Sequence, residues 1–242
     1  MAKTIIVIPT YNEKENISLL LKEIFKILPE IHILVVDDTS PDRTGEQVKK
    51  LQEKHPNLFL LTNSKKSGLG NAYIEGFKKI IKDNEFDFAV MMDADFSHQP
   101  EYLPRLLSEK EKYGLIIGSR YVKGGGLTSQ WEFWRKILSR GANLYCRIIL
   151  RKKIKDWTGG FNCIQIRFLK KINFEQLKFS GYAFIISLKY LLIKAGAEHK
   201  EVPIFFKERR GGESKISNGI IREGIFTPLK LIFKKYFTET IS

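Results

Sequence analysis

Two carboxylates, Asp93 and Asp95, follow an apolar stretch at residues 88–92 and are well placed to bind a metal ion. Residues two apart in an extended chain point to the same side, roughly 6–7 Å apart. Such carboxylates repel each other unless a cation joins them. Mg²⁺ and Mn²⁺ prefer oxygen ligands and often share them with a substrate's phosphates. We therefore interpret the pair as a metal–diphosphate site, with a solvated acidic turn as the alternative; for nearby His98, a bond to backbone is favoured over a metal role.

Polar residues also follow two other apolar stretches in the first half of the chain. Residues 9–13 are Pro-Thr-Tyr-Asn-Glu, and Asp37 and Asp38 come after residues 32–36. Ligands of an open α/β sheet bind beyond the carboxyl ends of its strands, so these residues are expected to share one site with Asp93. Residues 65–72 open a helix with two glycines, a pattern that favours phosphate binding but is more often a simple turn.

The elements that position these residues alternate between buried strands and amphipathic helices. Short apolar runs predict strands at residues 4–8, 32–36, 58–61, 86–92 and 115–117. Helical spacing predicts helices at 15–28, 42–54, 69–81 and 101–113. This alternation predicts an α/β fold built from right-handed βαβ units around a mainly parallel sheet. In the less regular second half we expect helices at 132–150 and 181–194, and strands at 159–166 and 200–206.

The charge of the chain indicates an anionic partner. Its 242 residues carry 41 Lys and Arg against 27 Asp and Glu, a formal net charge of +14. Phosphorylated substrates or an anionic membrane surface fit this excess, and a Lys-rich, heat-adapted surface is the bland alternative. Nucleic acid is not an expected partner, because no reading module is visible. Cys146 and Cys163 are expected to be buried thiols in a reducing compartment.

Two segments are candidates for a membrane surface. The helix expected at 132–150 mixes Arg135, Arg140 and Arg147 with leucines and isoleucines, and residues 218–242 form a basic amphipathic tail after a domain at 1–217. Such a tail fits a membrane interface, packing on the domain, or packing on a membrane-anchoring partner. No run of about 18 apolar residues is present, and the apolar start at residues 5–8 is too short for a signal peptide. We expect a cytoplasmic protein, peripheral on a membrane.

Seven sequence blocks together resemble the family-2 glycosyltransferases of the nucleotide-sugar-binding GT-A fold, and within them the dolichyl-phosphate mannosyltransferases. The blocks are IPTYNEKENI (8–17), VVDDTSPDRT (35–44), SGLGNAY (67–73), MDADFSHQP (92–100), GSRY (118–121), WTGGF (157–161) and EVPIFF…GGESK (201–215). The resemblance covers about residues 4–215. It implies transfer of mannose from GDP-mannose to dolichyl or polyprenyl phosphate.

The resemblance also implies roles for single residues. The nucleotide sugar would be held by Pro9, Tyr11, Glu13, Asp37, Asp38, Lys66, Gly68, Asp93, Arg209 and Lys215, with Asp37 beside the nucleoside or supporting its loop. Asp93 and Asp95 would hold Mg²⁺ or Mn²⁺. The acceptor phosphate would be bound by Arg120, Arg135 and Ser139, and a loop with Arg209, Ser214 and Lys215 would close over both phosphates. The groups acting in catalysis would be Asp93, Asp95, Arg120 and Arg209.

Two departures from the family pattern bear on the donor. Asn162 replaces an Arg that relatives usually have, and Ser187 replaces a Glu that could bind sugar hydroxyls, which puts mannose in doubt more than the reaction type. A phosphate acceptor is already ionised at neutral pH and needs no strong base. We expect an oxocarbenium-like transition state and inversion.

Two alternatives stay open. One is a UDP-dependent transfer of glucose or N-acetylhexosamine to a lipid phosphate or to a glycan hydroxyl, where Asp156 would have to serve as the base. The other is a nucleotide-sugar-binding scaffold without turnover, which the intact Asp93 and Asp95 disfavour.

Overall fold

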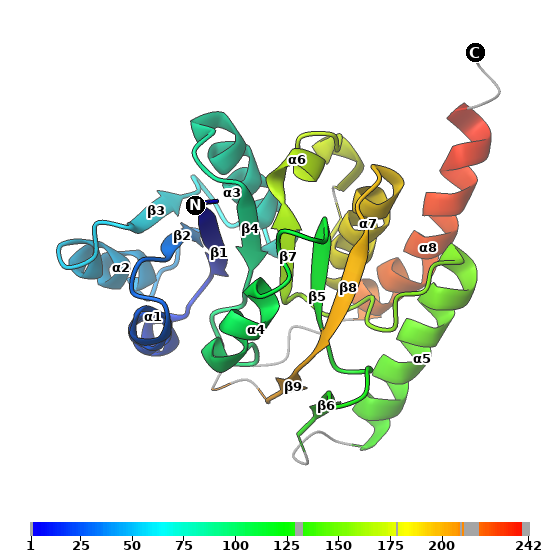
Figure 1. Cartoon of the computed structure of the whole chain (residues 1–242), viewed down its shortest axis with the longest axis horizontal. Coiled ribbons are helices and arrows are strands. Elements are labelled where there is room, and N and C mark those ends of the chain that lie inside the picture. Colours follow the sequence, from blue (N-terminus) through cyan, green and yellow to red (C-terminus); the bar gives the residue numbers. More distant parts are fainter. Residues whose placement is uncertain (1, 129–132, 178, 209, 211–217, 239–242) are drawn as a thin grey trace.

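A seven-stranded sheet forms the centre of the molecule (Figure 1). The computed structural model describes the chain apart from residues 1, 129–132, 178, 209, 211–217 and 239–242. In spatial order the strands are β3 (Leu58–Thr62), β2 (His32–Asp37), β1 (Thr4–Thr10), β4 (Phe88–Met91), β7 (Asn162–Gln165), β5 (Leu115–Ser119) and β8 (His199–Pro203). All neighbours pair in parallel except β7, which is antiparallel to β4 and β5. A small ribbon pairs β6 (Gly126–Leu127) with β9 (Phe205–Phe206).

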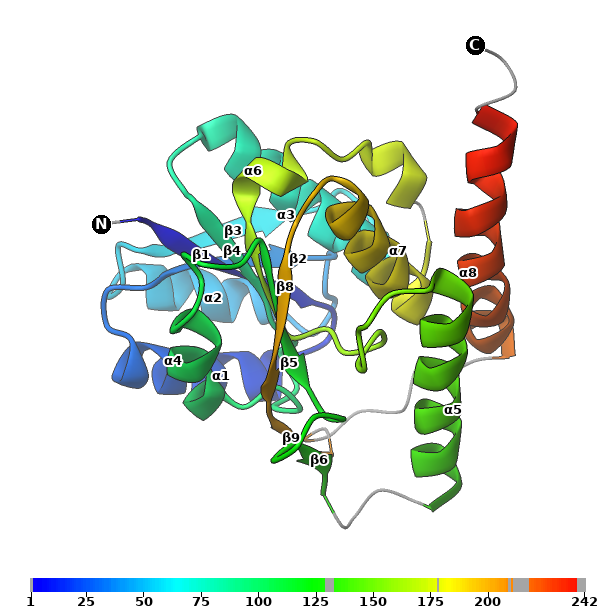
Figure 2. The same ribbon diagram turned by 45° about the vertical axis from the view of Figure 1, so that its right-hand side comes forward.

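Helices cover both faces of the sheet (Figures 1 and 2). One face carries α1 (Lys14–Ile27), α2 (Thr44–Gln52) and α4 (Leu103–Leu107), which follows the 3-10 turn η1 (Pro100–Tyr102). The other carries α3 (Leu69–Asp83), α5 (Phe133–Leu150), α6 (Ile166–Leu169), η2 (Phe174–Leu177), α7 (Gly181–Lys194) and α8 (Asn218–Thr238). Side chains alternate across a strand, so β1 sends Ile5 and Val7 into one core cluster and Ile6 and Ile8 into the other. Both faces of the sheet are therefore buried.

Three elements differ from the sequence-based expectation. Only residues 100–107 of the helix expected at 101–113 are helical, because no residue from 107 to 113 is buried and core packing does not support that part. The strand expected at 159–166 is shorter and lies antiparallel between β4 and β5. The strand expected at 200–206 divides at Ile204, whose N–H donates to Ser119 in the large sheet while its carbonyl accepts from Gly126 of the ribbon.

The C-terminal helix α8 packs on the domain. It contacts α5 and α7, and its Leu231 and Ile232 pack against the core cluster beneath α3 and α7. The Tyr145 hydroxyl of α5 donates to the Ile225 carbonyl, 2.8 Å away, and Pro228 lies inside the helix. Among the described residues, no helix combines the length and apolar character needed to cross a bilayer.

Candidate functional site

The strand order brings three polar segments together at the carboxyl ends of three neighbouring strands. β1 lies between β2 and β4, and the pairing register sets Thr10, its last residue, beside Asp37 at the end of β2. Asp93 and Asp95 follow the end of β4, the other neighbour of β1. Because all three strands are parallel, their carboxyl ends meet, as expected for the ligand site of an open α/β sheet.

Asp37 and Asp38 organise the loops at these strand ends. Asp37 accepts hydrogen bonds from the Thr10 hydroxyl and from the amide and hydroxyl of Ser40. Both carboxylates are only 3% exposed. The structure thus gives Asp37 the loop-supporting role.

Asp38 holds the turn that opens α3. It accepts from Asn63 Nδ2, the Ser67 hydroxyl, and the amides of Ser67 and Gly68, at 2.6–2.9 Å. Gly68 has φ +85°, in the left-handed region that favours glycine. The Gly68 amide therefore donates to Asp38 in this structure, and a phosphate at this helix end would need other donors.

Tyr11, Lys66 and Glu13 lie around the same loops. Lys66 Nζ sits 3.8 Å from the centre of the Tyr11 ring, which brings two predicted nucleotide-binding residues together. The Glu13 amide donates to the Thr44 hydroxyl, and its carboxylate accepts from Asn16 Nδ2 at 2.9 Å. Pro9 is buried within β1, where it lies beside Val36 of β2, near the end of the strand.

The loop after β4 holds Asp93 and Asp95 in place. Ser97 donates its amide and hydroxyl to Asp95 Oδ1 at 3.0 and 2.6 Å. His98 Nδ1 accepts the Asp93 amide at 2.9 Å, which confirms the backbone role expected for this histidine. Burial lowers the pKa of His98 and keeps the ring neutral, in the form that accepts this hydrogen bond.

The donor set of this loop fits a divalent cation. The Asp93 side chain is 30% exposed and Asp95 7%, so at least one carboxylate opens toward solvent. Both offer the hard oxygen ligands of Mg²⁺ or Mn²⁺, which complete their shells with water and substrate phosphates. No group of three His, Cys, Asp or Glu suited to a metal occurs in the described part of the chain. A shared, substrate-completed site is thus the kind these residues can build.

Tyr73 and Gly160 lie close to Asp93, and neither was predicted. Burial, and next the charge of Asp93, raises the pKa of the Tyr73 phenol well above its usual value, so it stays protonated beside that carboxylate. A Cβ on Gly160 would lie 3.3 Å from the His98 ring and 3.9 Å from Asp93 Oδ1. A side chain at residue 160 would therefore be tightly packed against the His98 ring.

Asn16 and Arg210 join the two halves of the site, and they too were missed. Asn16 Nδ2 donates both to Glu13 and to the carbonyl of Arg210, 194 positions away. The Arg210 amide donates to the Asp95 carbonyl at 2.9 Å. The segment after β9 is thereby tied to α1 and to the loop that carries Asp93 and Asp95. The neighbouring candidates Arg209, Ser214 and Lys215 lie outside the described residues.

Arg120, which the sequence predicts to bind the acceptor phosphate, is largely enclosed by protein in this structure. Its Nε and Nη2 donate to the two oxygens of Asp156 at 2.8 and 2.7 Å, and Nη2 also donates to Thr158. The Arg120 side chain is 4% exposed and Asp156 0%. Tyr121 and Phe206 flank the guanidinium. Its Nε and Nη2 are therefore engaged in hydrogen bonds within the protein.

Asp156 is likewise unsuited to act as a base for a hydroxyl acceptor. Burial by itself would raise the pKa of Asp156, but the Arg120 ion pair lowers it to about 2. Lys189, fully buried, donates to the carbonyls of Asp156 and Gly159 at 2.7 and 2.8 Å. Burial lowers the pKa of Lys189 to about 8. Arg120 and Lys189 thus anchor residues 156–160, and Gly160 of this segment lies near His98 and Asp93.

The predicted acceptor residues on α5 lie near this buried pair. The Ser139 hydroxyl accepts from Tyr121 at 2.7 Å, which leaves its own hydrogen able to reach a ligand. Arg135, one turn earlier and half-buried, lies beside the Trp134 ring. Asn162 and Ser187, the two departures from the family pattern, are both buried, at 1% and 0% exposure.

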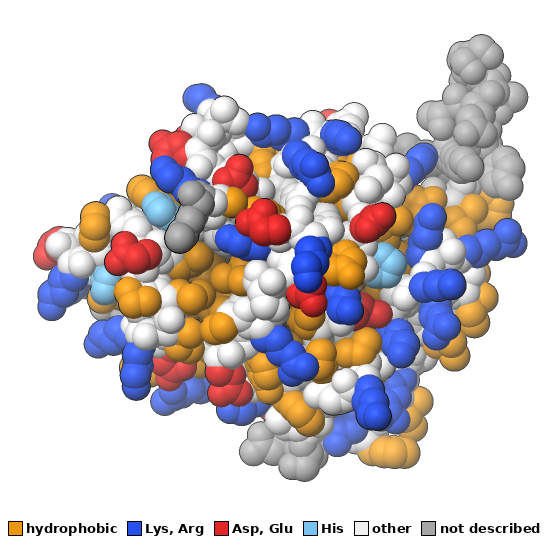
Figure 3. Space-filling model, in the orientation of Figure 1, with side chains coloured by type: hydrophobic (Ala, Val, Ile, Leu, Met, Phe, Trp, Pro, Cys, Tyr) orange, Lys and Arg blue, Asp and Glu red, His pale blue; other side chains and the backbone are white. Residues whose placement is uncertain are grey.

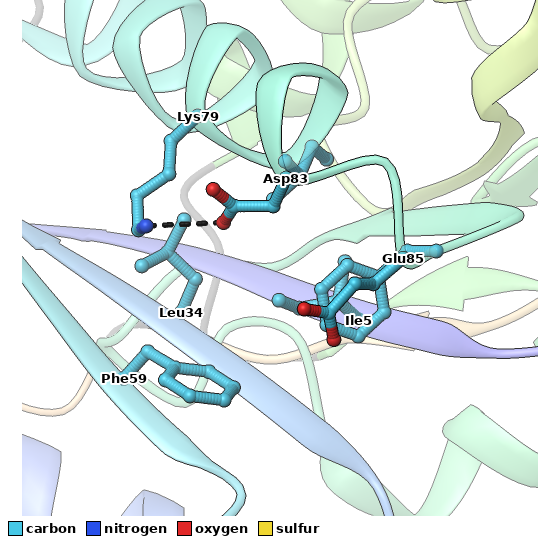
Figure 4. A pocket seen from close by; sticks show the side chains of 8 residues that line it. Ile5, Leu34, Phe59, Lys79, Asp83 and Glu85 are labelled. Atoms are coloured by element: carbon cyan, nitrogen blue, oxygen red, sulfur yellow. Dashed lines mark hydrogen bonds and ion pairs between the residues drawn. The ribbon is translucent and has the colours of Figure 1, made fainter.

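A small pocket elsewhere does not compete with this site. It measures about 80 Å³ and lies near the amino ends of β1 and β3, at the end of α3 (Figure 4). Lys79 and Asp83 pair across its mouth at 3.0 Å, above Ile5, Leu34 and Phe59. Ligand pockets usually measure about 300 Å³ or more, so this one is too small for a nucleotide sugar.

Comparison with known proteins places this geometry in a family. Residues 5–177 match the model described as glycosyl transferase family 2. The chain is 40% identical to the undecaprenyl-phosphate mannosyltransferase of Micrococcus luteus, over 92% of this chain and 91% of that protein. It is 41% identical to the polyprenol monophosphomannose synthase of Mycolicibacterium smegmatis (93% and 84%). It is 39% identical to the dolichol-phosphate mannosyltransferase of Pyrococcus furiosus, over 91% of this chain and 61% of that longer protein.

A solved structure confirms the GT-A type of fold. The glucosyl-3-phosphoglycerate synthase of Mycobacterium tuberculosis, in complex with Mn²⁺, UDP and phosphoglyceric acid, superposes with a TM-score of 0.67. The match covers 95% of this chain and 78% of that one, at 15% sequence identity. At this identity the likeness concerns the fold alone. It agrees with the mainly parallel, helix-covered sheet expected from the sequence.

Proposed function

The chain belongs to glycosyl transferase family 2 and is a glycosyltransferase, and from this premise we propose that it transfers mannose from GDP-mannose to polyprenyl phosphate. The observation that carries the proposal is the 39–41% identity to three proteins named as mannosyltransferases or mannose synthases of polyprenol phosphates, over more than nine tenths of the chain. The product would be a lipid phosphate sugar with inverted anomeric configuration.

The donor would bind along the carboxyl ends of β1, β2 and β4. Tyr11, Lys66 and Glu13 line the loops there and would contact the nucleoside. Asp37 and Asp38 would act through the loops they hold. Arg209 and Lys215 are proposed for the diphosphate from the family motif alone.

Asp93 and Asp95 would hold Mg²⁺ or Mn²⁺ on the donor diphosphate. The bound metal would neutralise the charge that develops on the leaving nucleoside diphosphate. Ser97 holds the Asp95 carboxylate and His98 the backbone amide of Asp93, while Tyr73 and Gly160 lie close to Asp93. A preformed arrangement of this kind lowers the cost of reorganisation during the reaction.

The acceptor phosphate would bind between α5 and the loop at 156–160. Arg135 supplies positive charge and Ser139 a hydroxyl donor. Since a phosphate monoester is already ionised near neutral pH, positioning replaces general-base catalysis. Arg120 would be a positioning residue here, because it fixes Asp156 and Thr158 beneath Ser139 and Asn143.

A membrane surface would present the lipid acceptor to α5. Its outward side exposes large apolar side chains, at exposures from 43% to 77%: Phe133, Trp134, Ile137, Leu138, Leu144 and Ile148. Basic residues flank them on the same helix, an arrangement typical of helices that lie in a bilayer interface. We propose this face of α5, on a peripheral protein, as the membrane contact.

The test is incorporation of labelled sugar into lipid. Purified protein is incubated with GDP-mannose, UDP-glucose or UDP-N-acetylglucosamine, each with a polyprenyl phosphate and Mg²⁺ or Mn²⁺. We expect label in the organic phase from GDP-mannose only, and none with EDTA. Asp95→Asn should lower kcat at least about 100-fold. The matched change Asp83→Asn should not, because Asp83 lies at the end of α3, near the amino ends of the strands. Label from a UDP-sugar would show that the donor is not GDP-mannose. Full activity in EDTA would show that the reaction needs no divalent metal.

A further inference from the structure

A cavity of about 300 Å³ lies beside α5, apart from the metal-binding loop. Its lining combines three cations with one apolar and two polar side chains: Tyr121, Arg140, Asn143, Leu144, Arg147 and Lys155. None of these lining residues is acidic. Arg140, Arg147 and Lys155 are exposed, and none of the three forms an ion pair with another described residue.

The cations of this cavity are not needed to hold its walls together. Asn143 Oδ1 accepts the amides of Trp157 and Thr158, and its Nδ2 donates to Ser139 and Thr158. The Glu201 carboxylate accepts the backbone amides of Lys155 and Asp156. The groups of Asn143 at the base of the cavity are thus hydrogen-bonded without help from the three cations. An anion in the cavity would be attracted by all three cations that line it.

The surroundings of the cavity identify the class of anion. Arg140, Leu144 and Arg147 stand at i, i+4 and i+7 and share one face of α5, and Ile148 follows on that side. Leu144 and Ile148 are 57% and 63% exposed. Figure 3 shows Lys and Arg side chains gathered over α5, with hydrophobic side chains along its outer edge. A phosphate next to exposed apolar side chains matches the boundary between headgroups and acyl chains of a bilayer. A soluble phosphate would have no use for the apolar rim.

We propose that this cavity binds the phosphodiester headgroup of an anionic phospholipid. The site adjoins the proposed acceptor residues, because its lining residues Tyr121 and Asn143 both hydrogen-bond to Ser139, but its three cations are not among those residues. It would orient the protein so that α5 lies in the surface that holds the lipid acceptor. The inference rests on the proposed function for its purpose, but binding of the headgroup can be measured without sugar donor or turnover.

The test is co-sedimentation of the full chain with vesicles of phosphatidylcholine, with or without phosphatidylglycerol. Three proteins are compared: wild type, Arg140→Gln/Arg147→Gln/Lys155→Gln, and the control Lys49→Gln/Lys50→Gln/Lys54→Gln. The control removes the same charge from exposed positions on and after α2, at the opposite end of the molecule (Figures 1 and 2). We expect phosphatidylglycerol to strengthen vesicle binding of wild type and control. The cavity variant should bind vesicles that contain phosphatidylglycerol at least about tenfold more weakly than wild type. Unchanged melting temperatures establish that all three proteins are folded.

Three outcomes would overturn the proposal. Equal losses in both variants would mean a diffuse attraction of the whole positive charge. Unchanged binding of the cavity variant would mean that the headgroup binds elsewhere. Release of wild type from vesicles by inorganic phosphate or glycerol 3-phosphate at constant ionic strength would make a soluble phosphate the ligand. Absence of mannose transfer alone would refute the proposed function and leave this result standing.

Discussion

At the scale of single residues, the ion pair of Arg120 and Asp156 has the largest energetic consequence. Both side chains are almost fully buried and joined by two hydrogen bonds of 2.7 and 2.8 Å. Removing one partner of such a pair leaves the other charge without compensation in a medium of low polarity. The pair also supports residues 156–160, and Gly160 of this segment lies near His98 and Asp93.

Asp156→Asn should therefore lower the free energy of unfolding by about 3–5 kcal/mol. Urea denaturation measures the change. The control is Glu75→Gln, which breaks the exposed pair with Lys78 and should cost less than about 1 kcal/mol. A loss below about 1 kcal/mol for Asp156→Asn would mean that Arg120 is compensated by other groups.

The low pKa of Asp156 predicts a specific acid sensitivity. Against the opposing effect of burial, Arg120 keeps the folded-state pKa at about 2, whereas the ordinary value is 3.8. In the window between, the unfolded chain binds a proton that the folded chain does not, so stability falls as the pH drops from about 4 to 2. The stability difference between wild type and Asp156→Asn should shrink by about 2 kcal/mol across this window. A difference that stays constant with pH would contradict the assignment.

At the scale of elements, α3 connects the sheet to the site. It begins at the turn that Asp38 holds and packs its glycine face on β1 and β2. A Cβ on Gly76 would lie 2.8 Å from Val7 and 3.1 Å from Val36, whereas Gly141 in α5 has open space around it. The close approach of α3 places Tyr73 beneath Asp93.

The same substitution in these two helices should have opposite effects. Gly76→Ala should destabilise the protein by about 1–3 kcal/mol, since packing strain outweighs the gain in helix propensity. Gly141→Ala should stabilise it by up to about 1 kcal/mol, because only the propensity changes. Thermal denaturation of the two variants gives the comparison. Stabilisation by both would show that α3 can shift away from the sheet.

At the scale of the whole molecule, the C-terminal helix is part of the folded domain. Leu231 and Ile232 of α8 pack against the core cluster, and Thr227 and Pro228 are buried. Ile225 and Phe226, by contrast, are 50% and 47% exposed. The sequence predicts a domain that ends at residue 217 and a separate tail after it. The tail contains α8, a helix that contributes to the core of that domain. Its apolar residues serve two surfaces, one internal and one external.

Deleting residues 218–242 should lower the melting temperature by at least about 5 °C, because it uncovers parts of α5 and α7. The matched variant Ile225→Ser/Phe226→Ser keeps the buried side of α8 and should leave the melting temperature within about 2 °C. Differential scanning calorimetry separates the two. An unchanged melting temperature after deletion would mean that α8 contributes nothing to the domain. Vesicle binding by α8 is best tested with the point variant, since the deletion also changes stability.

The sequence alone determined the class of fold, its strands up to residue 119, and the residues at the carboxyl ends of three of those strands. These features follow from local rules, because apolar periodicity sets strands and helices and parallel strands align their ends. The roles of Arg120, Asp156 and Lys189, the link from Asn16 to Arg210, and the position of β7 between β4 and β5 were decided by tertiary structure. Each depends on which residues distant in sequence become neighbours. Burial then decides whether a charged side chain faces a ligand or pairs within the protein, and no spacing in the sequence specifies that.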